Sequence, residues 1–145
     1  MDTSFKILMG FFRKSKQEKV KINPLVVYSA VILRNRGTRY SFLHQQLKAV
    51  ADKGYDFQAR FRAYIEGERS EGLDNFLGGL ENAGFVDTNK GNFSVTHSGI
   101  RLLERKILEA YRDDPTKILR FSNDVGIDLT DILKRFLQES LPKSP

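Results

Sequence analysis

Residues 84–99 read GFVDTNKGNFSVTHSG, and this stretch decides the fold that the sequence predicts. Two short apolar segments surround a polar turn, TNKG, an arrangement typical of a two-stranded β-hairpin. The alternation of side chains predicts that Phe93 and Val95 are buried and that Asn92 and Ser94 are exposed. Because a two-stranded hairpin is not stable alone in water, we expect this one to pack on neighbouring helices.

A helix is predicted on each side of the hairpin. Before it, Ser70 is a favourable N-cap residue and Gly84 ends the helix. The apolar stripe of this helix consists of Leu73, Phe76, Leu77 and Leu80. After the hairpin, Thr96 caps a second helix, which Asp114 and Pro115 end. The apolar stripe of the second helix consists of Ile100, Leu103, Ile107 and Tyr111.

The most apolar segment of the chain is Leu25–Leu33, which reads LVVYSAVIL. Its β-branched residues are typical of a strand. Its length, the preceding Pro24 and the Gly37 that follows favour a helix, because Pro suits the first helical position and Gly follows many helix ends. We therefore predict a buried helix here.

Two further helices are expected between this segment and Ser70. One covers Ser41–Lys53, with Ser41 as its cap. The other covers Asp56–Glu66, because apolar residues recur there at helical spacing. Those residues are Phe57, Phe61, Tyr64 and Ile65. Residues 38–40 could form a short strand.

Two helical segments are expected near the C-terminus, at about residues 116–123 and Leu129–Leu141, with Gly126 between them. The apolar face of the last helix consists of Leu129, Ile132, Leu133, Phe136 and Leu137. Such a face either caps the core of its own chain or pairs with a second copy.

The composition excludes several classes of function. The chain has 145 residues, enough for one domain with a real core, and no cysteine, so disulfides and thiolate metal sites are absent. His44 and His97 are the only histidines, and neither has a second ligand at metal spacing. No phosphate-binding glycine motif follows a predicted strand. We expect no catalytic residue, metal or cofactor, and a cytoplasmic protein without a signal or membrane span.

The positive charge is concentrated at the N-terminus. The net charge is +6, of which residues 1–22 carry +4, residues 23–112 carry +3 and residues 113–145 carry −1. The first segment also contains an apolar set at helical spacing, Phe5, Leu8, Phe11 and Phe12. A basic amphipathic arm of this kind can lie on an anionic membrane or bind a partner, or it can pack on the fold or on a second subunit.

The residues around the hairpin resemble a known pattern. The chain contains L-x-x-L-x-x-x-G-F-V before the hairpin and V-T-x-x-G-x-x-L-L-E at its end. The matching residues are Leu77, Leu80, Gly84, Phe85, Val86, Val95, Thr96, Gly99, Leu102, Leu103 and Glu104. This pattern is similar to the winged helix-turn-helix domains of prokaryotic regulators of the PadR-like and MarR-like kind.

The resemblance implies a mainly α fold with a small β-hairpin. It divides the chain into an N-terminal arm (1–22), a winged-helix domain (23–112) and a C-terminal helical extension (113–145). It further implies a transcriptional regulator that binds double-stranded DNA and forms a homodimer through its N- or C-terminal helices.

In such domains the helix before the wing enters the major groove and the wing tip contacts the DNA backbone or minor groove. These would be Ser70–Ala83 and Thr88–Asn92. One helix is then additional, either Ser41–Lys53 or Asp56–Glu66. The candidate DNA-binding residues are Arg34, Arg36, Arg39, Arg60, Arg62, Arg69, Asn75, Lys90 and Asn92.

The predicted recognition helix departs from the pattern. It contains Glu71, Asp74 and Glu81 but no Lys, Arg or His. Three acids facing a polyanion oppose binding, since neutralisation of phosphates supplies most non-specific affinity. The alternative function is therefore a winged helix that associates with proteins, whose basic arm docks on a partner or a membrane.

Overall fold

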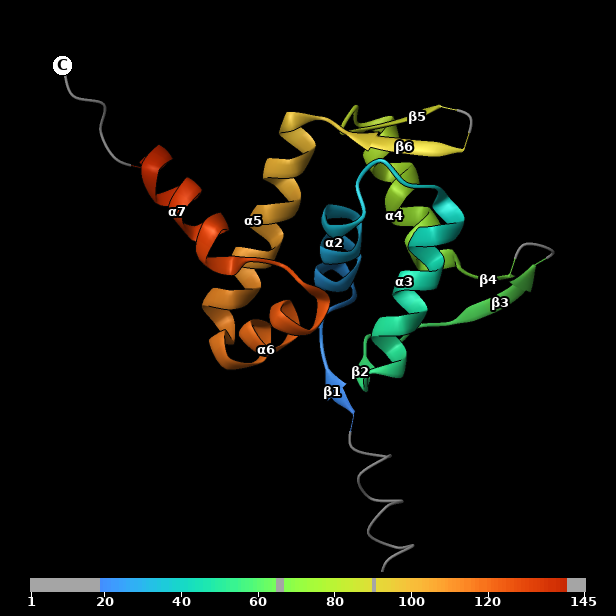
Figure 1. The fold of residues 1–145 in the computed structure, drawn as a ribbon, viewed down its shortest axis with the longest axis horizontal. Helices are drawn as coiled ribbons and strands as arrows, with labels where there is room; N and C mark the ends of the chain where they lie inside the picture. Colours follow the sequence, from blue (N-terminus) through green and yellow to red (C-terminus); the bar gives the residue numbers. More distant parts are fainter. Residues whose placement is uncertain (1–18, 65–66, 90, 141–145) are drawn as a thin grey trace, which may run out of the picture.

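The computed structural model describes residues 19–64, 67–89 and 91–140 (Figure 1). These residues form six helices and three two-stranded sheets, which confirms a mainly α fold with small hairpins. In chain order the elements are β1 (Val20–Lys21), α2 (Pro24–Arg34), α3 (Tyr40–Asp52), β2 (Tyr55–Asp56), β3 (Phe61–Tyr64), β4 (Gly67–Ser70), α4 (Glu71–Asn82), β5 (Val86–Asn89), β6 (Asn92–Val95), α5 (His97–Asp113), α6 (Pro115–Val125) and α7 (Leu129–Ser140). The predicted amphipathic set at residues 5–12 and Lys90 lie outside the described residues.

Helix α2 is the centre of the molecule (Figure 1). It contacts α3, α4, α5 and α6, and its Val27, Ala30 and Ile32 are completely buried. The side chain of Asn23 caps its first turn, and Pro24 occupies the first helical position. The prediction of a buried helix is therefore confirmed. Other helices surround α2, which explains why its sequence has no polar face.

The predicted helix over Asp56–Glu66 is wrong. Asp56 ends β2, which pairs in parallel with β1, and Phe61–Tyr64 is the first strand of an antiparallel hairpin with β4. The side chain of Asp56 accepts a hydrogen bond from the backbone N–H of Gln58, whose φ of 58° lies in the left-handed region. This local turn replaces a first helical turn, so the helical spacing of Phe57 and Phe61 does not reflect a shared helix face.

The segment before α3 forms one bridge rather than a strand. Arg39 pairs antiparallel with Asn92 of β6, and the N–H of Tyr40 donates to the carbonyl of Gly91. Helix α3 begins at Tyr40, so the prediction of Ser41 as its cap is wrong. The ring of Tyr40 stacks on Phe93 with centroids 5.9 Å apart, which fixes the start of α3 against the hairpin.

The hairpin and its two flanking helices agree with the sequence. Ser70 and Thr96 cap α4 and α5 through their side-chain oxygens. Phe93 is 2% exposed and Val95 is half-buried, while Asn92 and Ser94 are exposed. The hairpin therefore packs on the helices by one apolar face, as expected.

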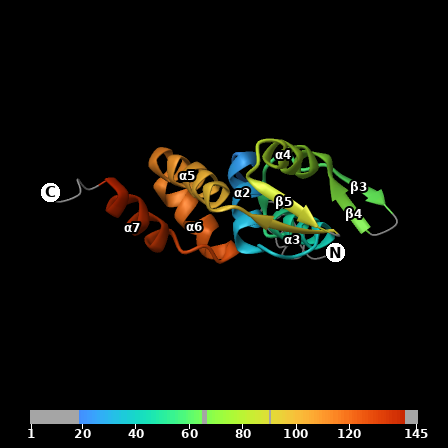
Figure 2. The ribbon, with the colours of Figure 1, turned by 90° about the horizontal axis from the view of Figure 1, so that it is seen from above.

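The segments before α2 and after α5 also contribute to the hydrophobic core. Ile22, which follows β1, is buried, as are Ile118 and Phe121 of α6. Gly126 ends α6 in the left-handed conformation, with φ of 79°, and turns the chain toward α7. The hairpins and α7 lie at opposite ends of an elongated molecule (Figure 2).

Candidate nucleic-acid interface

Two hairpins project from the same end of the molecule, away from α7 (Figures 1 and 2). Helix α4 connects them, because β4 ends at Ser70 immediately before α4 and β5 begins at Val86 shortly after it. The β3–β4 hairpin lies where the sequence predicts a helix. The two hairpins and the exposed face of α4 form the candidate interface.

Each acidic side chain of α4 has a partner. Arg62 on β3 forms an ion pair with Glu71 at 2.8 Å, and Arg69 on β4 forms one with Asp74 at 2.8 Å. The hydroxyl of Thr88 on β5 donates to Glu81 at 3.0 Å. The two hairpins thus supply cations or donors to the acids whose charge opposes DNA binding.

The outward face of α4 is small and uncharged between these acids. Asn75, Gly79 and Asn82 are exposed, and Gly78 is half-buried. A Cβ atom added at Gly78 or Gly79 would meet nothing within 4 Å. Since glycine costs about 1 kcal/mol relative to alanine inside a helix, these two positions weaken α4 without a packing reason within the described chain.

A buried histidine joins α3 to the start of α4. His44 is 1% exposed, and its Nε2 lies 3.0 Å from Asp74 while its Nδ1 accepts a hydrogen bond from the N–H of Ser70. This pattern assigns the neutral ring with the proton on Nε2. Burial lowers the pKa of His44 below its ordinary 6.5, although Asp74 opposes the shift.

The sequence alone does not indicate a role for His44. Its place between Leu43 and Leu47, on the face of α3 that packs inward, was the available signal. Its partner Asp74 lies thirty positions away, so only the tertiary structure brings the two together.

The predicted arginine cluster is divided by the fold. Arg39 lies against the β5–β6 hairpin through its bridge to Asn92. Arg34 instead lies over Gly126, where an added Cβ would come within 2.9 Å of its Nε. Arg34 and Arg36 both line a groove between α2, α5 and α7. The predicted cluster therefore consists of residues that lie on two different surfaces.

The remaining predicted contacts lie mostly at the hairpins. Arg60 and Asn92 are exposed, and Asn75 lies on the outward face of α4. Arg62 and Arg69 carry the ion pairs to α4 described above. Lys90 lies outside the described residues.

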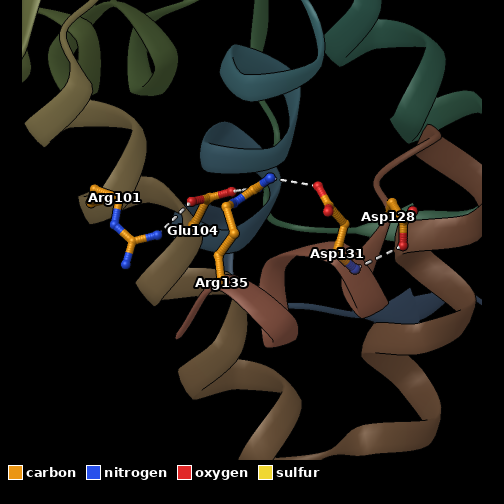
Figure 3. Close-up of polar contacts among 5 residues, drawn as sticks. All are labelled: Arg101, Glu104, Asp128, Asp131 and Arg135. Carbon is orange, nitrogen blue, oxygen red and sulfur yellow. Dashed lines mark hydrogen bonds and ion pairs between the residues drawn. The ribbon is translucent and has the colours of Figure 1, made fainter. Parts of the chain in front are cut away.

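A second polar cluster lies beside α7, at the other end of the molecule (Figure 3). Glu104 on α5 is 2% exposed, and Arg101 on the same helix and Arg135 on α7 both point toward it. Arg135 also pairs with Asp131 at 2.5 Å. Arg101 and Glu104 pair at i,i+3 spacing on α5, and the hydrogen bond to Glu104 raises the pKa of Arg135.

No protein-family model, curated protein or solved structure matches this chain. Residues 19–64, 67–89 and 91–140 include no group of three side chains able to hold a metal ion. Across the same described residues, every helix is too short or too polar to cross a bilayer.

Proposed function

We propose that this chain is a transcriptional regulator that binds double-stranded DNA as a winged helix-turn-helix protein. In this proposal α4 enters the major groove and the β5–β6 hairpin is the wing. The observation that carries the proposal is the joint placement of α4 and its two hairpins, with the acids of α4 paired and its outward face left uncharged.

The chain order supports the assignment of the wing. A bridge from Arg39 joins the segment before α3 to β6, so three segments meet at the hairpin, and α2, α3 and α4 lie beneath them. A winged helix is built from three helices and such a small sheet. In this proposal the β3–β4 hairpin is the insertion, in place of the additional helix that the sequence predicted.

The outward face of α4 supports contact with DNA. Gly78 and Gly79 allow close approach of the helix backbone to phosphates, and Asn75 and Asn82 carry amides that can pair with adenine. Arg39, bridged to Asn92 next to the turn of the β5–β6 hairpin, and Arg60, just before β3, are both exposed. They would neutralise phosphates on either side of α4.

A salt series tests the proposal. Fluorescence anisotropy with a random pool of short duplexes should detect binding at low salt, with log K falling linearly with log salt as counterions are released. Arg39→Glu should weaken binding at least tenfold and make the slope shallower by about one unit. Lys134→Glu on α7 makes the same charge change at the other end of the molecule and should leave both nearly unchanged.

A second variant separates contact from charge. The double change Gly78→Ala and Gly79→Ala should stabilise the isolated helix, by about 1 kcal/mol per glycine, and should weaken duplex binding because two methyl groups enter the interface. Unchanged duplex affinity in this variant, or failure of the wild type to bind any duplex at low salt, would overturn the proposal.

The alternative function is a winged helix that binds another protein. It is favoured by the same ion pairs, because arginines committed to Glu71 and Asp74 leave α4 without an excess of positive charge. A partner recovered by wild type and lost with the Gly78→Ala and Gly79→Ala variant, without any duplex binding, would support it.

We also propose that a homodimer forms through α7. Leu129 and Ile132 of this helix pack on the chain's own core, whereas Leu137 is 64% exposed. Leu137→Glu should shift a dimer to the monomer in sedimentation velocity; a monomeric wild type would contradict this proposal.

A further inference from the structure

A groove lies far from the candidate interface, beside α7. It has a volume of ≈ 890 Å³ and is formed by the end of α2, the start of α5, the turn after α6 and helix α7. This volume falls within the range that is typical of small-molecule sites. Its lining combines four arginines with several aliphatic side chains.

Two of the four arginines are already committed. Arg101 and Arg135 both contact Glu104, and Arg135 also contacts Asp131, so these charges offset one another (Figure 3). Asp128 uses its carboxylate to accept a hydrogen bond from the backbone N–H of Asp131 at the start of α7. Each acidic side chain of the groove therefore forms an ion pair or accepts a hydrogen bond.

Arg34 and Arg36 are the other two arginines, and both are exposed. Within the part of the chain that the structure describes, neither forms an ion pair with an acidic side chain. Gly126 leaves the space that the side chain of Arg34 occupies, since an added Cβ would lie 2.9 Å from its Nε. The groove thus has two guanidinium groups that pair with no acidic side chain among the described residues.

Aliphatic side chains line the rest of the groove beside these arginines. They are Leu33, Ile100, Ile127 and Ile132. A fully hydrated ion such as phosphate would leave this apolar lining unused. An anion with a hydrocarbon chain satisfies both parts of the groove, because burial of the chain contributes about 0.8 kcal/mol per CH₂.

We propose that this groove binds a small organic anion, a carboxylate with an apolar chain, whose head group pairs with Arg34 and Arg36 and whose chain lies on Leu33 and Ile100. Guanidinium groups bind carboxylates through two parallel hydrogen bonds, which fixes the orientation of the ligand. The ligand therefore joins the end of α2 to the start of α5. This site is independent of the proposed DNA-binding function.

Isothermal titration calorimetry of the full chain with octanoate tests the site. One octanoate should bind per chain, and the neutral octanamide should bind at least tenfold more weakly because it lacks the charge that Arg34 and Arg36 recognise. Inorganic phosphate should also bind at least tenfold more weakly than octanoate, because it has no chain to bury.

Variants locate the binding in this groove. The double change Arg34→Ala and Arg36→Ala should weaken octanoate binding at least tenfold, while Arg105→Ala with Arg112→Ala removes the same charge from exposed positions of α5 and should leave it unchanged. If the first double variant unfolds early in a thermal melt, Arg36→Ala alone serves, since Arg36 lies in the exposed loop after α2. Equal affinity for octanoate and octanamide, equal affinity in both double variants, or no binding of octanoate overturns the proposal.

Discussion

The two hairpins beside α4 are held by different forces. The β5–β6 hairpin is anchored by apolar burial, since Val86 is 1% and Phe93 is 2% exposed and Tyr40 stacks on Phe93. The β3–β4 hairpin is held at the surface by ion pairs, from Arg62 to Glu71 and from Glu68 to Lys48, whose side chains are all largely exposed.

This difference predicts which hairpin is sensitive to salt. Apolar burial stabilises by an amount that salt hardly weakens, whereas exposed ion pairs contribute little and are screened by salt. The β5–β6 hairpin is therefore expected to be a fixed part of the core. The β3–β4 hairpin is expected to respond to ionic strength.

The largest effect is expected for Phe93→Ala. Removing a buried aromatic ring leaves a cavity and should lower the free energy of unfolding by about 3–5 kcal/mol. Chemical denaturation measures this change. Phe61→Ala on β3 is the matched control, because Phe61 is only half-buried and its ring contacts Lys48 at the surface. Equal losses in the two variants would remove the distinction between the hairpins.

A smaller effect is expected for Gly99→Ala at the start of α5. An added Cβ would collide with the backbone carbonyl of Phe85 and with the side chain of Val95, at the base of the β5–β6 hairpin. Overpacking of this kind should cost about 1–3 kcal/mol of unfolding free energy. Gly79→Ala, where the added Cβ meets nothing, should instead be stabilising in the same measurement. If the Gly99→Ala variant is as stable as wild type, the backbone at Phe85 and the side chain of Val95 shift at little cost in free energy.

A pH effect is expected at the foot of the β3–β4 hairpin, where His44 accepts from the N–H of Ser70. Because burial lowers the pKa of folded His44 below 6.5, the unfolded chain binds the proton first as the pH falls. The free energy of unfolding should therefore decrease as the pH falls from about 6.5 toward the lower folded pKa, and the contribution of His44 should be constant above that window.

The variant His44→Gln should remove this slope, and His97→Gln, at the only other histidine, should keep it. Denaturation curves at several pH values between neutrality and mild acid give the slope directly. An identical slope in wild type and His44→Gln would show that His44 does not carry the pH dependence.

The smallest effect is expected for Arg62→Ala. Its ion pair with Glu71 joins side chains that are 69% and 55% exposed, so its loss should cost no more than about 0.5 kcal/mol. The cost should vanish in high salt. Arg60→Ala, which removes an exposed charge from the same segment, is the control. A loss that persists in high salt would mean that Arg62 contributes by packing rather than by charge.

Much of the fold could be predicted because local signals agree with the tertiary structure. The N-caps at Ser70 and Thr96 and the helix end at Gly126 act over three or four residues, so the sequence alone locates them. The segment after Asp56 could not be predicted in this way. Its apolar spacing suits a helix, and only the pairing of β2 with β1 and of β3 with β4 overrides that preference.

The candidate interface was predicted less completely than the fold. Arg39 lies against Asn92 of the β5–β6 hairpin, whereas Arg34 lies over Gly126. Arg34 and Arg39 are close in sequence, so the sequence predicts one cluster. The turn after α2 separates them onto different surfaces. From the sequence, Asp74 is an acid that opposes DNA binding. In the structure its carboxylate contacts His44 and Arg69.

The sequence by itself determined the helices, the β5–β6 hairpin and the apolar faces that join them, because caps, turns and hydrophobic periodicity are local properties of the chain. The tertiary structure alone decided which charges on different elements meet. The pairing of Arg62 with Glu71, of His44 with Asp74 and of Arg135 with Glu104 joins different elements, up to 31 positions apart. Electrostatic contacts depend on distance in space rather than along the chain, and so only the folded chain shows which surface charges remain available for a ligand.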